Sequence, residues 1–503
     1  MSEKKILGTV LGQGNQADEV LVISTIDKAG TIRKGTVIAH DTLNETMLLQ
    51  VVNKITWSNV SEQDLYLMSE NERLAYQIIQ RSPKSYLLRC TVTGAIRDEG
   101  AGSQIFSGTT SFVADKSSEV RFLQSTEAAL IYNKGTLFVG RTVDDYPVTL
   151  PVNGLVQRHL SIIGMTGSGK SYLLGLLCEE LAKHKAALLI IDAHNEYLPM
   201  AQTLPREVRR MLYSVGTAVG LNSYTMDIKE LTARDFQHFT GMGSGSTSIV
   251  ESVIQALRES TPQYTIDDIL KALDSKTRNG SPSEKAAALW ARNYIQTLAN
   301  TGMIGINEPP IKEMVNANQM TVIAMSGVRE RIQQFITTSI LQRIFNARKR
   351  DEIPPLVLIV EEAHRFAPSQ EQVSSSDLMR TLAAEGRKFG ICLVVVSQRP
   401  NRLDATVLSQ CVTNIVMKVK NPADLTSIRE SAENVTEDIL NELPRFERGE
   451  ALVMGEAFPM SIRFKTRSNR MTEHGGKSVD FEAAWRQEAE RNNVKRFEFP
   501  TEI

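Results

Sequence analysis

The rhythm of hydrophobic and polar positions changes along the chain. Over roughly the first 130 residues, short apolar runs such as DEVLVIS and YLLRCTVTG are separated by Gly, Asn and Asp turn signals. This pattern is typical of a small β-barrel or sandwich. One helical stretch, NERLAYQIIQ, interrupts it. From about residue 131, apolar strands alternate with helices, which predicts an α/β fold with a mostly parallel sheet covered on both faces.

Five apolar runs are the predicted strands of that sheet. They are HLSIIG (159–164), ALLIID (187–192), TVIAMS (321–326), LVLIVEE (356–362) and ICLVVVS (391–397). Between the second and third runs, apolar residues recur at helical spacing, and Thr265 with Asp268 resembles a capping box. We therefore predict four parts: a β-barrel at 1–130, a P-loop ATPase core of the RecA type at 131–228 and 304–470, an inserted helical bundle at 229–303, and a C-terminal helix and tail at 471–503.

Composition narrows the class of protein. The 503 residues are 42% hydrophobic and 23% charged, with a net charge of −1. This balance argues against a globally basic nucleic-acid coat, so any DNA contact must be concentrated in a local groove or channel. The four scattered cysteines form no C-x-x-C pair, which favours a reducing compartment. The start, MSEKKILGTV, lacks a signal-peptide pattern, so a cytoplasmic protein without membrane contact is expected.

The strongest chemical signal is an octapeptide that matches G-x-x-x-x-G-K-[ST] between an apolar strand and a helix. Such a loop surrounds phosphate oxygens with backbone N–H groups at a helix N-terminus. Lys170 would reach the β- and γ-phosphates of ATP, and the Ser171 hydroxyl would complete the shell of a Mg²⁺ ion. The eight residues are Gly164, Met165, Thr166, Gly167, Ser168, Gly169, Lys170 and Ser171.

Two adjacent acids follow the apolar run of LVLIVEEAH. Glu361 and Glu362 come at the carboxyl end of a predicted strand, where the sites of α/β proteins form. We assign Glu361 to the Mg²⁺ shell and Glu362 to the water that attacks the γ-phosphate. A solvated acidic turn is the alternative. The pair of acids favours a hydrolysing motor over a nucleotide-binding switch.

The stretch EGRKFGICLVVVSQRP has polar residues at both ends of a strand. Gln398, after the strand, is placed to sense the γ-phosphate through its amide, as in P-loop ATPases with an added central strand. Arg387 precedes the strand, and six strand residues span roughly 20 Å, so it cannot reach the same phosphate. Either Arg387 acts on the ATP of a neighbouring subunit, or Arg387 and Lys388 are a solvated helix end. The spacing leaves both open.

Two further segments carry weaker signals. IIDAHNEY places Asp192, His194 and Glu196 after the second strand, either as a metal site or, as we favour, as a capped turn. Arg158 precedes the strand of the phosphate loop and is unremarkable without a partner. Arginines that could line a pore and contact DNA are Arg329, Arg331, Arg399 and Arg402, although ordinary surface charges are the simpler explanation.

In this order and spacing, GMTGSGKS, IIDAHNEY, LVLIVEEAHRFAP, EGRKFG and VSQRP resemble the HerA family of hexameric ATPases, relatives of the FtsK translocases. The resemblance covers nearly the whole chain and implies a homohexameric ring with ATP at subunit interfaces and double-stranded DNA in the central pore. It implies that Arg387 is an arginine finger, that Arg158 contacts nucleotide, and that Asp192 lies near the metal or water.

The resemblance extends to the end of the chain. SIRFKTRSN, with Lys465 and Thr466, would reach a nucleotide from the ring neighbour, and the C-terminal segment would brace subunits. The family usually has D-P-H-G-E-Y where this chain has DAHNEY, and Asn195 suits a left-handed backbone there.

Family members work with an effector, which implies a partner such as a NurA-like nuclease or a sirtuin-like NADase. The modest charged fraction does not suggest a hyperthermophile. Because many bacterial relatives in the resembled family act in defence against phages, the resemblance then implies a bacterial member of that type. Two functions stay open at this point. One is an ATP-driven translocase on double-stranded DNA that drives a partner enzyme. The other is an assembly scaffold in which nucleotide controls an effector with little translocation.

Overall fold

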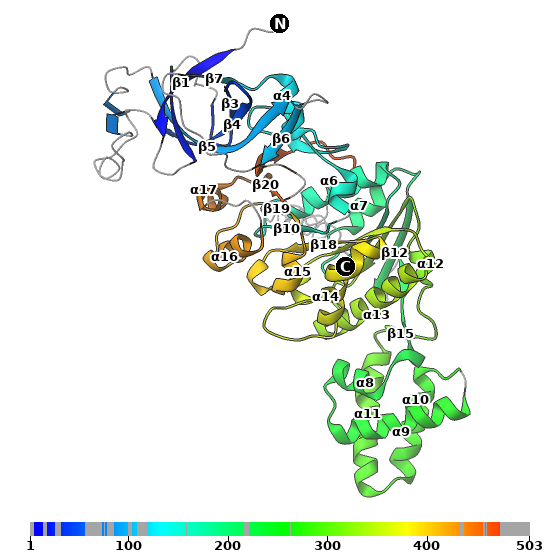
Figure 1. Cartoon of the computed structure of the whole chain (residues 1–503). Coiled ribbons are helices and arrows are strands. Elements are labelled where there is room, and N and C mark those ends of the chain that lie inside the picture. Colours follow the sequence, from blue (N-terminus) through cyan, green and yellow to red (C-terminus); the bar gives the residue numbers. More distant parts are fainter. Residues whose placement is uncertain are drawn as a thin grey trace, which may run out of the picture.

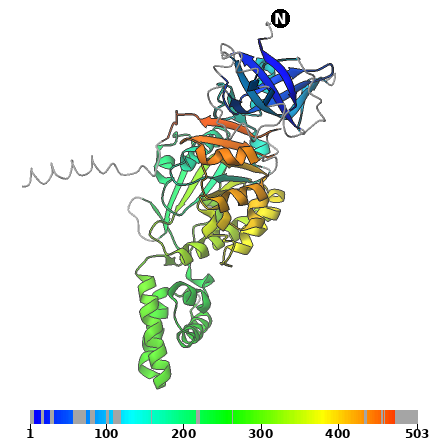
Figure 2. The ribbon, with the colours of Figure 1, turned by 90° about the vertical axis from the view of Figure 1, so that its left-hand side faces the viewer.

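The computed structural model describes residues 5–13, 18–25, 32–55, 73–74, 76–77, 85–98, 103–107, 118–156, 158–215, 221–261, 263–432, 437–455, 458 and 460–472. The molecule is elongated, with a β-barrel at one end, an α/β core in the middle and a helical bundle at the other end (Figures 1 and 2). The helix expected at NERLAYQIIQ lies largely outside the described residues, as does the C-terminal part beyond Thr472.

The N-terminal domain is a closed antiparallel barrel, as predicted. Its strands pair in the order β2-β1-β7-β3-β4-β5, and the first half of β5 pairs with β2 to close the ring, while β6 pairs with the last residues of β5 beyond β2. Alternate side chains fill the barrel, among them Val22, Leu49 and Val120. The bounds are β1 (Ile6–Gln13), β2 (Glu19–Thr25), β3 (Val37–Asp41), β4 (Thr46–Ile55), β5 (Ser85–Asp98), β6 (Ser103–Ser107) and β7 (Glu119–Phe122).

The core is a twelve-stranded sheet in the described part of the chain, in the order β13-β12-β16-β11-β17-β18-β10-β19-β20-β21-β8-β9. Pairing is parallel from β13 to β19 and antiparallel from β19 to β9. The bounds are β8 (Leu137–Arg141), β9 (Pro147–Leu150), β10 (Leu160–Ile163), β11 (Ala187–Asp192), β12 (Arg209–Val215), β13 (Asn222–Tyr224), β16 (Gln319–Ala324), β17 (Leu356–Val360), β18 (Ile391–Ser397), β19 (Thr413–Val416), β20 (Glu450–Met454) and β21 (Ile462–Thr466).

The five strands predicted from the sequence form the centre of this sheet, as β10, β11, β16, β17 and β18. Their fully apolar sequences have a physical cause, because both faces are buried. Along β17, Leu358 and Val360 face one hydrophobic core while Val357 and Ile359 face the other. The order also confirms that β18 is an added central strand, since it separates the acidic strand β17 from β10.

Helices cover both faces of the sheet. α6 (Lys170–Lys183) and α7 (Leu198–Thr203) share one core with the strands, and α13 (Glu330–Lys349) and α14 (Ser376–Glu385) share the other. The shorter helices are α4 (Ser125–Tyr132), α5 (Val152–Val156), α12 (Ile311–Met314), α15 (Ala405–Ser409), α16 (Pro422–Ser431) and α17 (Glu437–Glu442). No described helix is long and apolar enough to cross a membrane.

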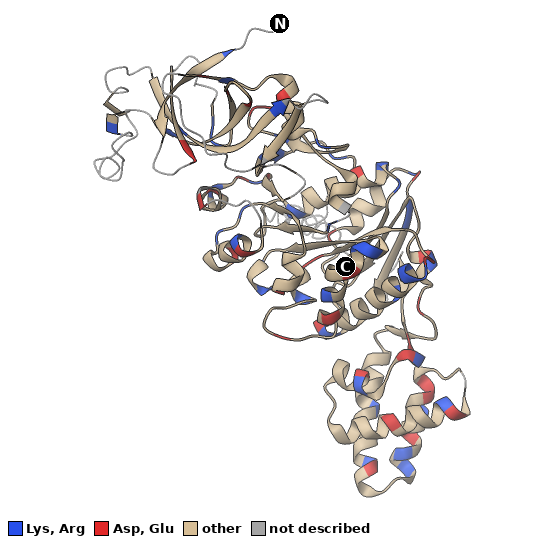
Figure 3. Ribbon diagram, viewed as in Figure 1, with Lys and Arg blue, Asp and Glu red and all other residues tan. Residues whose placement is uncertain are grey.

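The predicted insertion is a bundle of four helices, α8 (Ala233–Thr240), α9 (Ser244–Ser260), α10 (Ile266–Asn279) and α11 (Pro282–Ala299). A short parallel pair, β14 (Met226–Asp227) and β15 (Ile304–Gly305), connects it to the core. The expected capping box at Thr265 and Asp268 is confirmed, since each side chain accepts from the backbone N–H of the other. Basic and acidic residues are interspersed over the bundle (Figure 3).

Candidate functional site

The octapeptide forms a phosphate-binding loop between β10 and α6, as predicted. Gly167 and Gly169 have φ of 79° and 112°, in the left-handed region that glycine adopts without a steric penalty. Gly169 is the N-cap of α6, so Lys170 and Ser171 start the helix at its positive end. This backbone is suited to an anion such as the phosphate groups of a nucleotide.

A pocket of about 310 Å³ opens over this loop. It lies at the carboxyl edge of the parallel strands, because the loop follows β10, the two acids follow β17 and Gln398 follows β18. The residues predicted from the sequence that line it include Lys170, Ser171, Glu361, Glu362 and Gln398. The tertiary fold therefore gathers side chains that lie up to 228 positions apart, from Lys170 to Gln398, around one cavity.

The pocket concentrates negative charge that a cation would stabilise. Burial, followed by the charges of Asp192 and Glu196, raises the pKa of Glu361 to about 9. Its Oε2 atom is buried and has no hydrogen-bond partner among the described residues. Burial lowers the pKa of Lys170, and the neighbouring carboxylates oppose that shift. A buried carboxylate oxygen and a serine hydroxyl that line one pocket are oxygen donors of the kind that fit Mg²⁺.

Glu362 is held in an unusual backbone conformation at the edge of the pocket. Its φ and ψ of 50° and 45° lie in the left-handed region, which costs a non-glycine residue energy and is frequent at functional sites. Its side chain accepts a hydrogen bond from the Gln398 backbone N–H. His364 Nδ1 lies 3.2 Å from Glu362 Oε2 and 3.1 Å from Ser397 Oγ. Burial lowers the pKa of His364 to about 4, so this contact is neutral at physiological pH.

Gln398 is joined directly to the phosphate loop. The Thr166 hydroxyl donates to Gln398 Oε1 over 2.5 Å. Because β10 and β18 are paired neighbours, their following loops lie side by side. Gln398 is thus positioned next to the place where the loop would hold phosphate, as expected from the sequence.

The two acids of DAHNEY have different roles in the structure. Asp192 is fully buried and accepts from the backbone N–H groups of His194, Glu196 and Tyr197, so it caps the turn, the interpretation we favoured. Glu196 instead lines the pocket and accepts from the Ser171 hydroxyl. Asn195 has the expected left-handed backbone, with φ of 61°.

A metal site made from this segment alone is not present. Within the described ranges, no group of three or more His, Cys, Asp or Glu side chains has the arrangement to hold a metal ion. The alternative of a site from Asp192, His194 and Glu196 was therefore wrong, because the Asp192 oxygens are used by backbone N–H groups. A Mg²⁺ ion that keeps waters and phosphate oxygens needs only one or two protein ligands.

Arg387 and Arg158 lie at the opposite edge of the sheet from the pocket. Arg387 is exposed on the short 3₁₀ turn η3 (Gly386–Phe389), and Arg158 precedes β10, where its carbonyl accepts from the Val412 N–H. The seven residues of β18 separate Arg387 from Gln398, which is more than roughly 20 Å along the strand. Neither arginine reaches the nucleotide pocket of its own chain.

The segment that holds Lys465 and Thr466 is the end of β21 and lies near the phosphate loop. The Thr466 N–H donates to the Gly449 carbonyl, and the Gly449 N–H donates to the Ser168 carbonyl of the phosphate loop. Lys465 pairs with Glu447 at 3.1 Å. These backbone bonds place the segment beside the phosphate loop of the same chain, and a contact with a nucleotide across a subunit interface stays a prediction.

Several pocket residues were not predicted. Arg448 lines the pocket from the loop before β20, and Tyr172 lines it from the first turn of α6. Arg448 has no motif to mark it, since it is a lone arginine in FERGE. One feature of the sequence could have drawn attention to the surroundings of Tyr172. Two adjacent acids, Glu179 and Glu180, stand in the otherwise apolar stretch LLGLLCEELAK, and acids are rare on a buried helix face unless they have partners.

Comparisons with known proteins agree with the motifs. Residues 135–344 match the family model described as "Helicase HerA, central domain". The chain is 26% identical over 504 residues to "Probable helicase MJECL08" of Methanocaldococcus jannaschii, which covers 92% of this chain and 95% of that protein. It is 25% identical over 403 residues to "DNA double-strand break repair helicase HerA" of Saccharolobus solfataricus, covering 76% and 79%.

Among solved structures, the chain is similar to VirB4 of Thermoanaerobacter pseudethanolicus, with a TM-score of 0.48 and 14% identity over 66% of this chain and 96% of that one. The resemblance that the motifs indicated is confirmed by the sequence matches.

Proposed function

We propose that this chain is a HerA-type P-loop ATPase that hydrolyses ATP with Mg²⁺ in a ring of six copies and uses the energy to move double-stranded DNA. One observation carries the proposal. A phosphate loop, two buried acids and Gln398 converge on one pocket, while Arg387 is exposed at the opposite edge of the sheet.

The residues of the pocket divide the chemistry. Lys170 and the N–H groups of the loop hold the β- and γ-phosphates. Ser171 and Glu361 would hold Mg²⁺, which neutralises charge on the phosphates when bound. Glu362, held by the Gln398 N–H and His364, orients and polarises the attacking water. The Gln398 amide lies beside the loop and contacts the γ-phosphate and this water.

The position of Arg387 supports the proposed ring. A hydrolysing P-loop site gains a large rate factor from a guanidinium that stabilises transition-state charge. Arg387 cannot supply it within its own chain, so the site is complete only when the edge with Arg387 and Arg158 faces the pocket of a second copy. The number six comes from the HerA resemblance.

Exposed arginines at the carboxyl edge are the proposed DNA contacts. Arg399 and Arg402 follow Gln398, and both act with Arg365 on the pKa of His364, so three guanidinium groups gather there. Arg329 and Arg331 are exposed at the start of α13, after β16. A local cluster of this kind is what a chain with a net charge of −1 needs to bind a polyanion.

We expect the double substitution Arg399→Gln and Arg402→Gln to weaken DNA binding and flatten its salt dependence. Each lost phosphate contact lowers the slope of log K against log salt by about one, so the double variant should lose about two. The measurement is DNA affinity at a series of salt concentrations. A matched control is Lys271→Gln with Lys276→Gln, two exposed cations of the bundle. An unchanged slope in the Arg399 and Arg402 variant would remove these residues from the DNA path.

An effector enzyme completes the proposal. A NurA-like nuclease or a sirtuin-like NADase is the partner that the resemblance implies, and a cytoplasmic role in defence against phages stays a prediction. The decisive experiment measures ATP turnover with and without double-stranded DNA, and effector activity with wild type and with Glu362→Gln. A translocase requires turnover to rise with DNA and effector stimulation to be lost in the variant. Turnover indifferent to DNA, with effector stimulation intact in Glu362→Gln, would instead identify a scaffold.

A further inference from the structure

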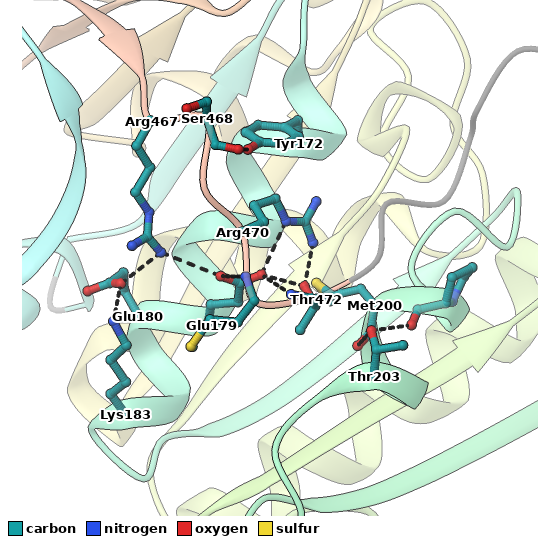
Figure 4. A network of polar contacts seen from close by, with 12 residues as sticks. Tyr172, Glu179, Glu180, Lys183, Met200, Thr203, Arg467, Ser468, Arg470 and Thr472 are labelled. Carbon is teal, nitrogen blue, oxygen red and sulfur yellow. Dashed lines mark hydrogen bonds and ion pairs between the residues drawn. The ribbon is translucent and has the colours of Figure 1, made fainter.

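A short C-terminal segment lies across the helix that carries the phosphate-loop lysine. We call residues 467–472 the strap (Figure 4). Its anchor is Glu179, on the third turn of α6, whose side chain is fully buried. Glu179 accepts from Arg470 Nε at 3.2 Å, from the Met471 N–H at 3.2 Å and from the Thr472 N–H at 3.1 Å. A buried carboxylate with so many donors holds the strap in one position.

A second anchor is found next to the first. Arg467 Nη2 lies 2.9 Å from Glu180 Oε1 and 3.4 Å from Glu179 Oε2. Arg470 is 5% exposed and its guanidinium packs on Gly175, where an added Cβ would lie 2.3 Å from Nη2. Gly175 therefore leaves the space on α6 that the strap occupies.

The strap contacts the nucleotide pocket through a single aromatic side chain. Tyr172 lines the pocket, and its hydroxyl donates to the Ser468 carbonyl over 2.6 Å. The Arg470 guanidinium lies 5.1 Å from the centre of its ring. One end of the tyrosine is thus tied to the strap and its ring packs on an arginine that is itself paired with Glu179.

Tyr172 occupies a different part of the pocket from the phosphate chemistry. The Tyr172 side chain contacts the strap, through the Ser468 carbonyl and the Arg470 guanidinium. The neighbouring Ser171 side chain points to the acids, since its hydroxyl donates to Glu196, which lines the pocket together with Glu361 and Glu362. The pocket therefore has one end with the phosphate loop and its acids, and another end with an aromatic ring. A nucleoside triphosphate likewise has a phosphate end and an aromatic base at the other end.

We propose that Tyr172 is the platform on which the base of the bound nucleotide packs, and that the strap is the device that orients its ring. The proposal rests on the proposed function, since it requires a nucleoside triphosphate in the pocket. A flat aromatic base gains contact energy from a tyrosine ring, whereas a phosphate group does not. Ser468 and Arg470 act through Tyr172 and are positioning residues.

The test compares a ligand that has a base with one that lacks it. Dissociation constants for ATP and for inorganic tripolyphosphate are measured by calorimetry on the full chain with Mg²⁺. We expect Tyr172→Ala to weaken ATP binding at least about fivefold, the lower end of what stacking on an aromatic side chain contributes. Tripolyphosphate affinity should change less than about twofold, within the ordinary scatter of surface substitutions. Tyr294→Ala, on α11 of the bundle, is the matched control and should change neither constant.

A milder substitution separates the ring from its hydroxyl. Tyr172→Phe keeps the aromatic surface and loses only the bond to Ser468, so it should retain ATP affinity better than Tyr172→Ala. If the two variants are equally weak for ATP, the ring is not a platform and the proposal fails. It also fails if Tyr172→Ala weakens ATP and tripolyphosphate by the same factor, which would mean that the substitution disturbs α6 and the phosphate loop.

The role of the strap is tested by a double-mutant cycle. Arg470→Lys keeps a charge for Glu179 but loses the planar group that packs on Tyr172. We expect it to lower the ratio of ATP to tripolyphosphate affinity in the wild-type background and to leave that ratio unchanged in the Tyr172→Ala background. A further fall in the second background would show that Arg470 does not act through Tyr172. If wild type binds neither ligand, the proposed function itself is wrong, an outcome distinct from all of these.

Discussion

Replacing Glu362 with Gln is expected to reduce ATP turnover by a factor of about 10²–10⁴, the usual contribution of a general base, while ATP affinity is retained. Gln keeps the size of the side chain and its bond from the Gln398 N–H but cannot take up a proton. The left-handed backbone at this position holds the group at the pocket edge in both variants. The measurements are steady-state turnover and ATP binding in the same preparation.

The control for this substitution is Glu352→Gln. Glu352 is exposed in the turn before β17, whereas Glu362 follows that strand, so the two acids flank its opposite ends. Its loss should leave turnover within about twofold of wild type. A Glu362→Gln protein that keeps more than a tenth of wild-type turnover would mean that another group polarises the water, and Glu196 would then be the first candidate because it lines the same pocket.

Arg387→Ala is expected to have an effect of similar or larger size, a loss of about 10³–10⁵ in turnover with ATP binding retained. The reason is geometric. The guanidinium lies beyond the length of β18 from its own pocket, so it can stabilise transition-state charge only in a neighbour's site. Lys388→Ala is the matched control, because Lys388 is an exposed cation on the same 3₁₀ turn. If Arg387→Ala and Lys388→Ala lower turnover equally, the two residues are a solvated helix end whose positive charge acts without a specific contact.

Mixed assemblies distinguish action between subunits from action within one. Lys170→Ala lacks a functional phosphate loop but keeps Arg387, and Arg387→Ala keeps the loop. In a co-expressed mixture, an interface between an intact loop and an intact arginine forms again, so turnover should rise above that of either variant alone. If assemblies that contain both chains show no recovery of turnover, Arg387 does not act on the site of a neighbouring subunit. The argument that the site needs a second copy, and hence a ring, would then fail.

Much of the nucleotide pocket was predictable because its parts are encoded in contiguous stretches. The loop from Gly164 to Ser171 has its chemistry and its backbone requirement in eight adjacent residues, and the structure shows the left-handed glycines it needs. The strands β10, β11, β16, β17 and β18 were recognisable because burial on two faces makes them apolar throughout. The place of three site residues was then predictable, because sites form at the carboxyl ends of such strands. These residues are Glu361, Glu362 and Gln398.

The remaining strands of the sheet were not predicted, because no contiguous stretch of sequence marks them. β20 and β21 lie in the antiparallel part of the sheet, where β21 pairs with β8 from far earlier in the chain, and β8 precedes the phosphate loop by more than twenty residues. Their sequences are short and mixed, so no local period separates them from loops. Arg448 depends on β20 for its place in the pocket and was missed with it.

By itself, the sequence determined that the chain has a phosphate loop, a pair of acids and a polar residue at the ends of buried parallel strands, because each of these is a local pattern. Only the tertiary structure decided that Glu196 rather than Asp192 faces the pocket, that Arg387 lies at the far edge, and that the strap ties Tyr172 to the buried Glu179. Those outcomes depend on which distant segments meet, and a buried carboxylate finds its partners only once the chain has folded.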